Sequence, residues 1–250
     1  MPCNCLISRR TMIRRLAAGA TGGLILWLFP PGLASGLERT GGAKRPYYAY
    51  AVDVSRCIGC CACMRACRAE NDVPEGRFRT WVERYRVSAS GQVQVDAATK
   101  DDFVFQESPA DNIVKAFFVP KLCNHCEKSV CSQVCPVGAT YTTPEGVVLV
   151  DGKRCIGCGY CVQACPYGTR FIHPVTHTAD KCTFCYHRIT KGQPPACVLA
   201  CPKGARIYGD LNDPTSRLST LLKQRRFRVL KPEMGTHPKC YYLDLDIEVI

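Results

Sequence analysis

Residues 155–166 read Cys155-Ile156-Gly157-Cys158-Gly159-Tyr160-Cys161-Val162-Gln163-Ala164-Cys165-Pro166. Three cysteines lie at intervals of three, a fourth follows after three further residues, and a proline comes next. A tight loop of this spacing can hold three corners of an iron–sulfur cubane, while the fourth cysteine starts a helix directed at a neighbouring cluster. The stretch therefore predicts iron–sulfur clusters arranged in pairs.

Three further groups of four cysteines share this design, and each ends in the spacing C-x3-C. The groups are Cys57, Cys60, Cys63 and Cys67; Cys123, Cys126, Cys131 and Cys135; and Cys182, Cys185, Cys197 and Cys201. With 155–165 they account for 16 of the 20 cysteines among 250 residues. A cysteine content this high is typical of disulfides, zinc or iron–sulfur clusters.

The spacing favours iron–sulfur clusters over the other two. Zinc is usually held by two C-x2-C pairs that lie farther apart, and disulfides require no such regularity. No C-x2-C-H sequence occurs, so the signature of covalent haem is absent. His125 lies between Cys123 and Cys126, and we expect it to pack there or at most to donate a hydrogen bond beside a cluster.

The chain also repeats itself. Residues 53–60 and 151–158 match in six of eight positions, and each follows a short apolar strand, 50–52 or 147–150. A strand that leads into a cluster loop is the start of a bacterial two-cluster ferredoxin unit. The prediction is an α+β fold of two pseudo-symmetric dicluster-ferredoxin units with loop and β-hairpin insertions.

Three elements lie outside the cysteine groups. Alternation over 81–95 with a turn at Ser90-Gly91 predicts a β-hairpin, 218–229 a short basic helix, and 241–249 a final strand. Nothing in these segments gathers a Ser/His/Asp set, a phosphate-binding glycine loop or a carboxylate pair, so we expect no catalytic site in this chain.

The net charge of +12 is better explained by cofactors than by nucleic acid. Removal of residues 1–35 would leave 29 basic and 21 acidic side chains, or +8. A [4Fe–4S] cubane with four thiolates carries about −2, so four clusters would bring the protein close to neutrality. Basic residues near the first cysteines (Arg56, Lys121, Arg154, Lys181) either raise the cluster potentials or merely offset this charge.

The N-terminus has the pattern of a twin-arginine export signal. Ser8-Arg9-Arg10-Thr11-Met12-Ile13-Arg14 precedes a 14-residue apolar stretch, 16–29, that is short for a membrane span, and small residues at 32–34 offer a cleavage site. The alternative is a basic, apolar tail with a chance pair of arginines. Because this route carries folded proteins, it suits a protein whose clusters are assembled in the cytoplasm, and it predicts a periplasmic location.

With these motifs in hand, the chain resembles the four-cluster electron-transfer subunits of complex iron–sulfur molybdoenzymes and related quinone-linked complexes. It is most similar to exported subunits of tetrathionate, polysulfide and nitrite reductase systems. The resemblance rests on the cysteine groups and on 122–126, 179–185, 195–197, 204–206 and 209–214. After the signal peptide predicted at 1–35, it implies a four-cluster domain at 36–250, which comprises an outer half (47–80 with 175–210), an inner half (115–174), a hairpin insertion (81–114) and a C-terminal extension (211–250).

The resemblance also implies that cysteine groups exchange ligands. The implied sets are Cys57, Cys60, Cys63 with Cys201; Cys67 with Cys182, Cys185, Cys197; Cys123, Cys126, Cys131 with Cys165; and Cys135 with Cys155, Cys158, Cys161. All 16 positions are cysteine, so four [4Fe–4S] clusters are expected. Cys61 and Cys240 are left over and are expected to pack rather than ligate.

The leading hypothesis is a relay of single electrons between two partners. One would be an NrfD-like polytopic, quinone-reactive membrane subunit and the other a molybdopterin catalytic subunit or a multihaem cytochrome c. The competing hypotheses are a free periplasmic polyferredoxin shuttle and a zinc-binding interaction module.

Overall fold

The computed structural model describes residues 44–98, 103–105, 112–246 and 249. The predicted signal at 1–35 therefore lies outside the described residues. Residues 45–250 form one compact unit. In the part of the chain that is described, no helix has the length and apolar character needed to cross a membrane.

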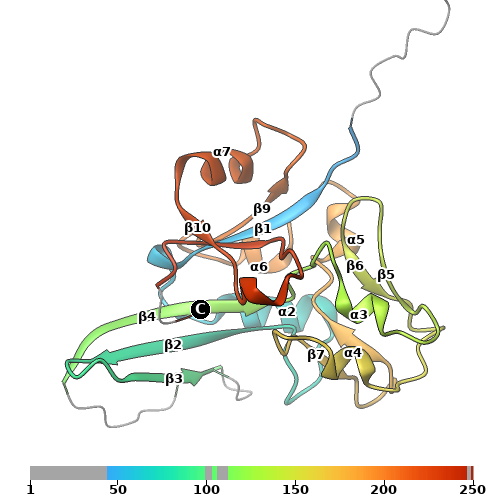
Figure 1. The fold of residues 1–250 in the computed structure, drawn as a ribbon, viewed down its shortest axis with the longest axis horizontal. Helices are drawn as coiled ribbons and strands as arrows, with labels where there is room; N and C mark the ends of the chain where they lie inside the picture. Colours follow the sequence, from blue (N-terminus) through green and yellow to red (C-terminus); the bar gives the residue numbers. More distant parts are fainter. Residues whose placement is uncertain (1–43, 99–102, 106–111, 247–248, 250) are drawn as a thin grey trace, which may run out of the picture. The chain divides into compact units, whose positions relative to one another are not determined.

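The fold is α+β, as predicted. One sheet has the strand order β10-β11-β1-β9, with β1 Tyr48–Asp53, β9 Arg206–Asp210, β10 Phe227–Arg228 and β11 Cys240–Leu243. Strand β1 pairs antiparallel with β9 and parallel with β11. This arrangement joins the first cysteine group to the end of the last one and to the C-terminal segment (Figure 1).

A second sheet, of order β3-β2-β4, extends to one side of the unit (Figure 1). It consists of β2 Thr80–Ser88, β3 Val93–Ala97 and β4 Ile113–Leu122. Strands β2 and β3 pair in antiparallel register from Glu83 with Ala97 to Val87 with Val93, so Ser90 and Gly91 lie in the turn as predicted.

Two short hairpins follow the inner cysteine groups, one after each group. They are β5 Thr140–Thr142 with β6 Val148–Val150, and β7 Arg170–Ile172 with β8 Ala179–Lys181. The strands predicted at 50–52 and 147–150 are present as β1 and β6.

Each cysteine group contains a helix that includes its third cysteine. These helices are α2 Ala62–Asn71, α3 Val130–Gln133, α4 Tyr160–Gln163 and α6 Ala196–Leu199. The remaining helical segments are α5 Tyr186–Ile189, α7 Arg217–Gln224, η2 Val54–Arg56 and η3 Pro232–Met234. Side chains from β1, β11 and α2, including Tyr50, Met64 and Tyr242, form the main core between the groups.

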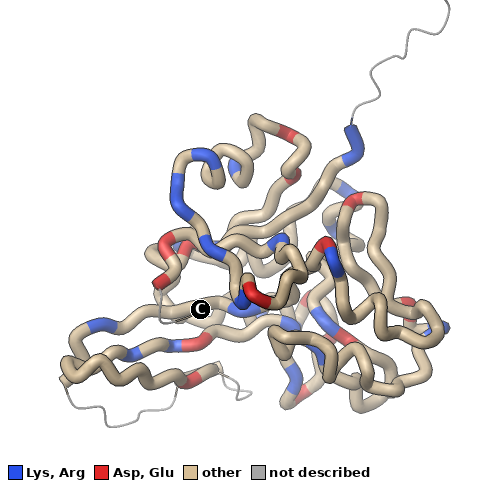
Figure 2. Tube along the Cα trace, in the orientation of Figure 1, with Lys and Arg blue, Asp and Glu red and all other residues tan. Residues whose placement is uncertain are grey.

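Two predictions near the C-terminus were wrong in extent. Helix α7 ends at Gln224 rather than Val229, because the backbone becomes extended at Arg225 and residues 227–228 pair with β11. Figure 2 shows that basic residues follow one another along this segment. The final strand covers 240–243 rather than 241–249, because Asp244 adopts a φ of 53° and its carboxylate pairs with Arg225.

Candidate iron–sulfur centres

The first and last cysteine groups share a cavity, here called cavity A. Its lining includes Cys57, Cys60, Cys63 and Cys201, although Cys57 and Cys201 are 144 positions apart in the sequence. The empty space is about 340 Å³. Cys61 also lines this cavity and is buried. The cavity therefore has a fifth thiol beside the four, although Cys61 is expected to pack rather than to ligate.

Cavity B is the counterpart of cavity A. Cys67 of the first group meets Cys182, Cys185 and Cys197 of the last group around an empty space of about 320 Å³. All four cysteines are buried.

Cavity C is built from the two inner groups. Cys123, Cys126, Cys131 and Cys165 line about 350 Å³ of empty space. Three cavities that are each lined by such a set of four thiols suit three copies of one cofactor.

The fourth set is described only through pairwise contacts. Cys161 interacts electrostatically with Cys155 and with Cys131 of cavity C. The sulfur of Cys155 accepts the N–H of Ala179 at 3.3 Å. That Cys135 and Cys158 join them in one site, here called site D, stays a prediction.

The loops that carry the first two cysteines of each group share a backbone feature. The third residue of every C-x2-C segment has a positive φ, namely Gly59, His125, Gly157 and Phe184. Glycine is required at 157, because a Cβ atom there would lie 2.3 Å from the carbonyl oxygen of His177. His125 and Phe184 adopt the same turn with large side chains.

Backbone N–H groups point at several cysteine sulfurs. Ala139 donates to Cys135 Sγ at 3.2 Å, Ala205 to Cys201 Sγ at 3.2 Å, and Phe184 to Cys182 Sγ at 3.4 Å. Donors in these positions stabilise negative charge on sulfur.

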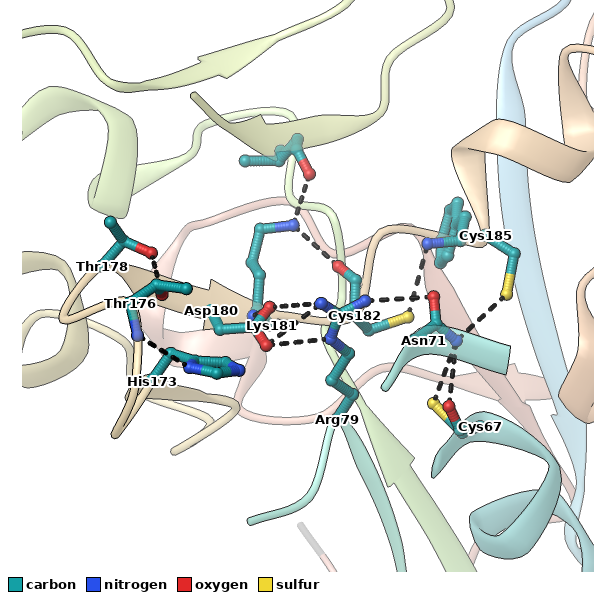
Figure 3. A network of polar contacts seen from close by, with 12 residues as sticks. Cys67, Asn71, Arg79, His173, Thr176, Thr178, Asp180, Lys181, Cys182 and Cys185 are labelled. Atoms are coloured by element: carbon teal, nitrogen blue, oxygen red, sulfur yellow. Dashed lines mark hydrogen bonds and ion pairs between the residues drawn. The ribbon is translucent and has the colours of Figure 1, made fainter. Parts of the chain in front are cut away.

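A network of polar contacts borders cavity B (Figure 3). The Asn71 amide nitrogen donates to the carbonyl of Cys67 at 3.1 Å and lies 3.7 Å from the sulfurs of both Cys67 and Cys185. Arg79 donates to the Asn71 side-chain oxygen at 3.0 Å and to Asp180 at 3.1 Å. The arginine therefore fixes the amide so that its N–H groups face the two sulfurs.

Cationic side chains are buried among the cavities. Arg206 and Lys181 are each 1% exposed, and Arg170 is 5% exposed. Lys181 donates to the carbonyl of Cys182 at 2.8 Å and to that of Val148. Lys181 was singled out from the sequence as a basic residue before a first cysteine, but the two arginines were missed. The missed signal is positional, since each arginine lies five residues after the last cysteine of a group.

His125 is fully buried and packs, as expected. Its Nδ1 accepts the N–H of Val148 at 3.0 Å, and burial holds its pKa well below the usual value. The proton of this neutral ring therefore lies on Nε2, next to the backbone of Cys182.

These residues fit an anionic sulfur-containing cofactor. The 18 cysteines in the described part of the chain are all free of disulfides. Burial raises the pKa of the Cys57 and Cys126 thiols to about 11, so a bound metal is needed to ionise them at neutral pH. Buried N–H donors without acceptors remain on Arg170 and Arg206. Inorganic sulfide and cysteine thiolate would supply both the acceptors and the negative charge.

Comparisons with known proteins agree with this chemistry. A family profile described as "4Fe-4S dicluster domain" matches residues 114–211. The predictions of a dicluster-ferredoxin fold and of four [4Fe–4S] clusters are confirmed.

Several relatives match over most of their length. The B subunit of tetrathionate reductase from Salmonella typhimurium is 45% identical over 241 residues, or 96% of this chain and 89% of the relative. The corresponding B subunit from Archaeoglobus fulgidus is 47% identical over 79% of this chain and 82% of its own. Protein NrfC of Escherichia coli is 43% identical over 78% and 79%. The chain therefore belongs to the family of iron–sulfur electron-transfer subunits of reductase complexes that includes NrfC and the B subunit of tetrathionate reductase.

Proposed function

We propose that this protein is an exported subunit that relays single electrons between two partners of a periplasmic respiratory complex. One partner is a polytopic, quinone-reactive membrane subunit, and the other is a molybdopterin catalytic subunit or a multihaem cytochrome c. The observation that carries the proposal is that cysteines from distant groups line common cavities. We expect crossed groups to place the sites in a row, because the two sites of each pair share the same two cysteine groups.

The ligand sets follow the cavities. Cavity A would hold a cluster on Cys57, Cys60, Cys63 and Cys201; cavity B on Cys67, Cys182, Cys185 and Cys197; and cavity C on Cys123, Cys126, Cys131 and Cys165. The fourth would be held by Cys135, Cys155, Cys158 and Cys161. When bound, a [4Fe–4S] cluster accepts or releases one electron at a time.

The protein's own residues set the environment of each site. The buried thiols of cavity B exclude water from the middle of the row. Cys60 of cavity A and Cys158 of site D are exposed, so the row has one accessible cysteine at each end. We expect electrons to enter at one of these ends and leave at the other, each end facing a different partner.

A subunit of a complex is favoured over a free shuttle. The relatives from Salmonella typhimurium and Archaeoglobus fulgidus are both named as subunits of a reductase. The partners then perform the chemistry, and this chain contributes no catalytic site. It is held at the membrane by the quinone-reactive subunit.

The test is purification of the full chain under anaerobic conditions from cells that express the neighbouring genes. We expect about four iron atoms for each set of four cysteines, little zinc, and a polytopic membrane protein that co-purifies. Protein with two clusters or fewer contradicts the ligand sets, and fully loaded protein without any partner supports the shuttle.

A further inference from the structure

Arg170 and Arg206 occupy equivalent places in the two halves. Each is the first residue of a strand, β7 or β9, and each lies five residues after the cysteine that closes its group. Each also donates to a threonine that begins the strand after the paired group. Arg206 reaches Thr80 at 2.8 Å, and Arg170 reaches Thr140 at 3.3 Å.

The Arg206 pair lies between cavities A and B. Arg206 lines cavity A, and its acceptor Thr80 lines cavity B. The Thr80 hydroxyl donates to the Lys121 carbonyl at 2.6 Å, so its oxygen is oriented to accept from the arginine. Tyr50, which interacts with Arg206, contacts the sulfur of Cys197 in cavity B at 3.3 Å.

Arg170 has the same place between cavity C and site D. It lines cavity C and donates to the sulfur of Cys131 at 2.9 Å. It also interacts with Cys161 of site D. Thr140, which accepts a hydrogen bond from Arg170, lies five residues after Cys135, another cysteine predicted for site D.

Neither guanidinium has an acidic partner among the described residues. Both are buried, and Nε and Nη1 of Arg206 and Nε of Arg170 have no hydrogen-bond partner. An isolated buried charge is very unfavourable, and guanidinium does not lose its proton in proteins. The counter-charge must therefore come from the contents of the cavities.

We propose that Arg206 and Arg170 are the shared counter-ions of the two cluster pairs, each raising the reduction potentials of both clusters between which it lies. The inference rests on the proposed function and extends it, because it assigns one permanent positive charge to each pair. A positive charge stabilises the more negative, reduced state. A buried guanidinium acts on the clusters through a low effective dielectric, whereas the charge of an exposed arginine is screened by water and salt.

The test is a redox titration of the full-length holoprotein, followed by electron paramagnetic resonance. Signals are assigned beforehand with Cys57→Ser and Cys182→Ser for the outer pair and with Cys123→Ser and Cys155→Ser for the inner pair. The variants are Arg206→Gln, Arg206→Lys and Arg170→Gln. The matched controls are Arg56→Gln and Arg154→Gln, which remove exposed arginines next to Cys57 and Cys155.

We expect Arg206→Gln to lower the equilibrium constant for reduction of both outer clusters about tenfold, which lowers each reduction potential by about 59 mV for one electron. The potentials of the inner clusters should stay unchanged. Arg170→Gln should do the reverse. Arg206→Lys should change the outer potentials by less than a third of the Arg206→Gln shift. The control variants should change the potentials little.

Shifts no larger than those of the controls, or shifts in the wrong pair, would overturn the inference. If Arg206→Gln loses outer-pair iron, retention in Arg206→Lys supports a need for charge, and loss in both variants refutes it. A different result would contradict the proposed function itself, namely wild-type protein that lacks the four cluster signals.

Discussion

The rings of His125 and Phe184 lie against each other, with centroids 3.7 Å apart and planes inclined by 31°. Each is the third residue of a C-x2-C loop, and both have positive φ values, 43° and 54°. His125 lines cavity C and Phe184 lines cavity B. The contact is therefore the place where the inner and outer cluster pairs meet.

The hydrogen bond from the Val148 N–H to the His125 ring predicts the effect of replacing His125. His125→Leu leaves the buried N–H of Val148 without its acceptor and should destabilise the protein by about 1–3 kcal/mol. His125→Asn should cost less, because asparagine tolerates a positive φ and offers an acceptor oxygen. Anaerobic denaturant unfolding of both variants measures the difference. Equal stability of His125→Leu and the exposed control His187→Gln would contradict the assignment.

Asn71 gives a prediction for one cluster alone. Its amide faces the sulfurs of Cys67 and Cys185, and hydrogen bonds to sulfur favour the reduced state. Asn71→Leu should therefore lower the equilibrium constant for reduction of the cavity B cluster about tenfold, which lowers its reduction potential by about 59 mV. Arg79→Gln should cause a smaller shift in the same direction, because it releases the orientation of the amide and removes a positive charge that Asp180 already offsets. Redox titration checks both.

The control for this network is Arg77→Gln, which removes an exposed arginine two residues from Arg79. If Arg77→Gln shifts the potential as much as Asn71→Leu, general surface charge rather than the oriented amide is responsible.

Much of this architecture could be predicted from the sequence, because cysteine spacing fixes local loops. The strands before Cys57 and Cys155 and the hairpin at Ser90-Gly91 follow from local patterns and are present. Helix α7 ends early because residues 227–228 pair with a strand distant in sequence, and local propensity contains no information on such pairing.

The buried arginines were missed for a related reason. Arg56 and Arg154 directly precede cysteines, yet both are exposed. Arg170 and Arg206 lie five residues after a group, where only the folded chain brings Arg170 to the wall of cavity C and Arg206 to the wall of cavity A. Lys181, which was identified, is buried at the end of β8, where it reaches carbonyls of both Val148 and Cys182.

Export is tested at Arg9 and Arg10, outside the described residues. Because the twin-arginine pair is read by the export machinery, replacement of both by lysine should leave the protein in the cytoplasm with its clusters assembled. Cell fractionation with iron analysis checks this outcome, and replacement of Arg14 and Arg15 by lysine is the matched control. Normal periplasmic accumulation of the Arg9/Arg10 variant would show that another route or a signal-bearing partner exports it.

The central claim is that distant cysteine groups share clusters, and Cys201 tests it most directly. Cys201 and Cys57 line cavity A, whereas Cys182 lines cavity B. The measurement is redox-titrated electron paramagnetic resonance of Cys57→Ser, Cys201→Ser and Cys182→Ser. Crossed ligation predicts that Cys57→Ser and Cys201→Ser lose or convert the same signal and that Cys182→Ser affects a different one. Loss of one common signal in Cys182→Ser and Cys201→Ser, with another signal lost in Cys57→Ser, would contradict it.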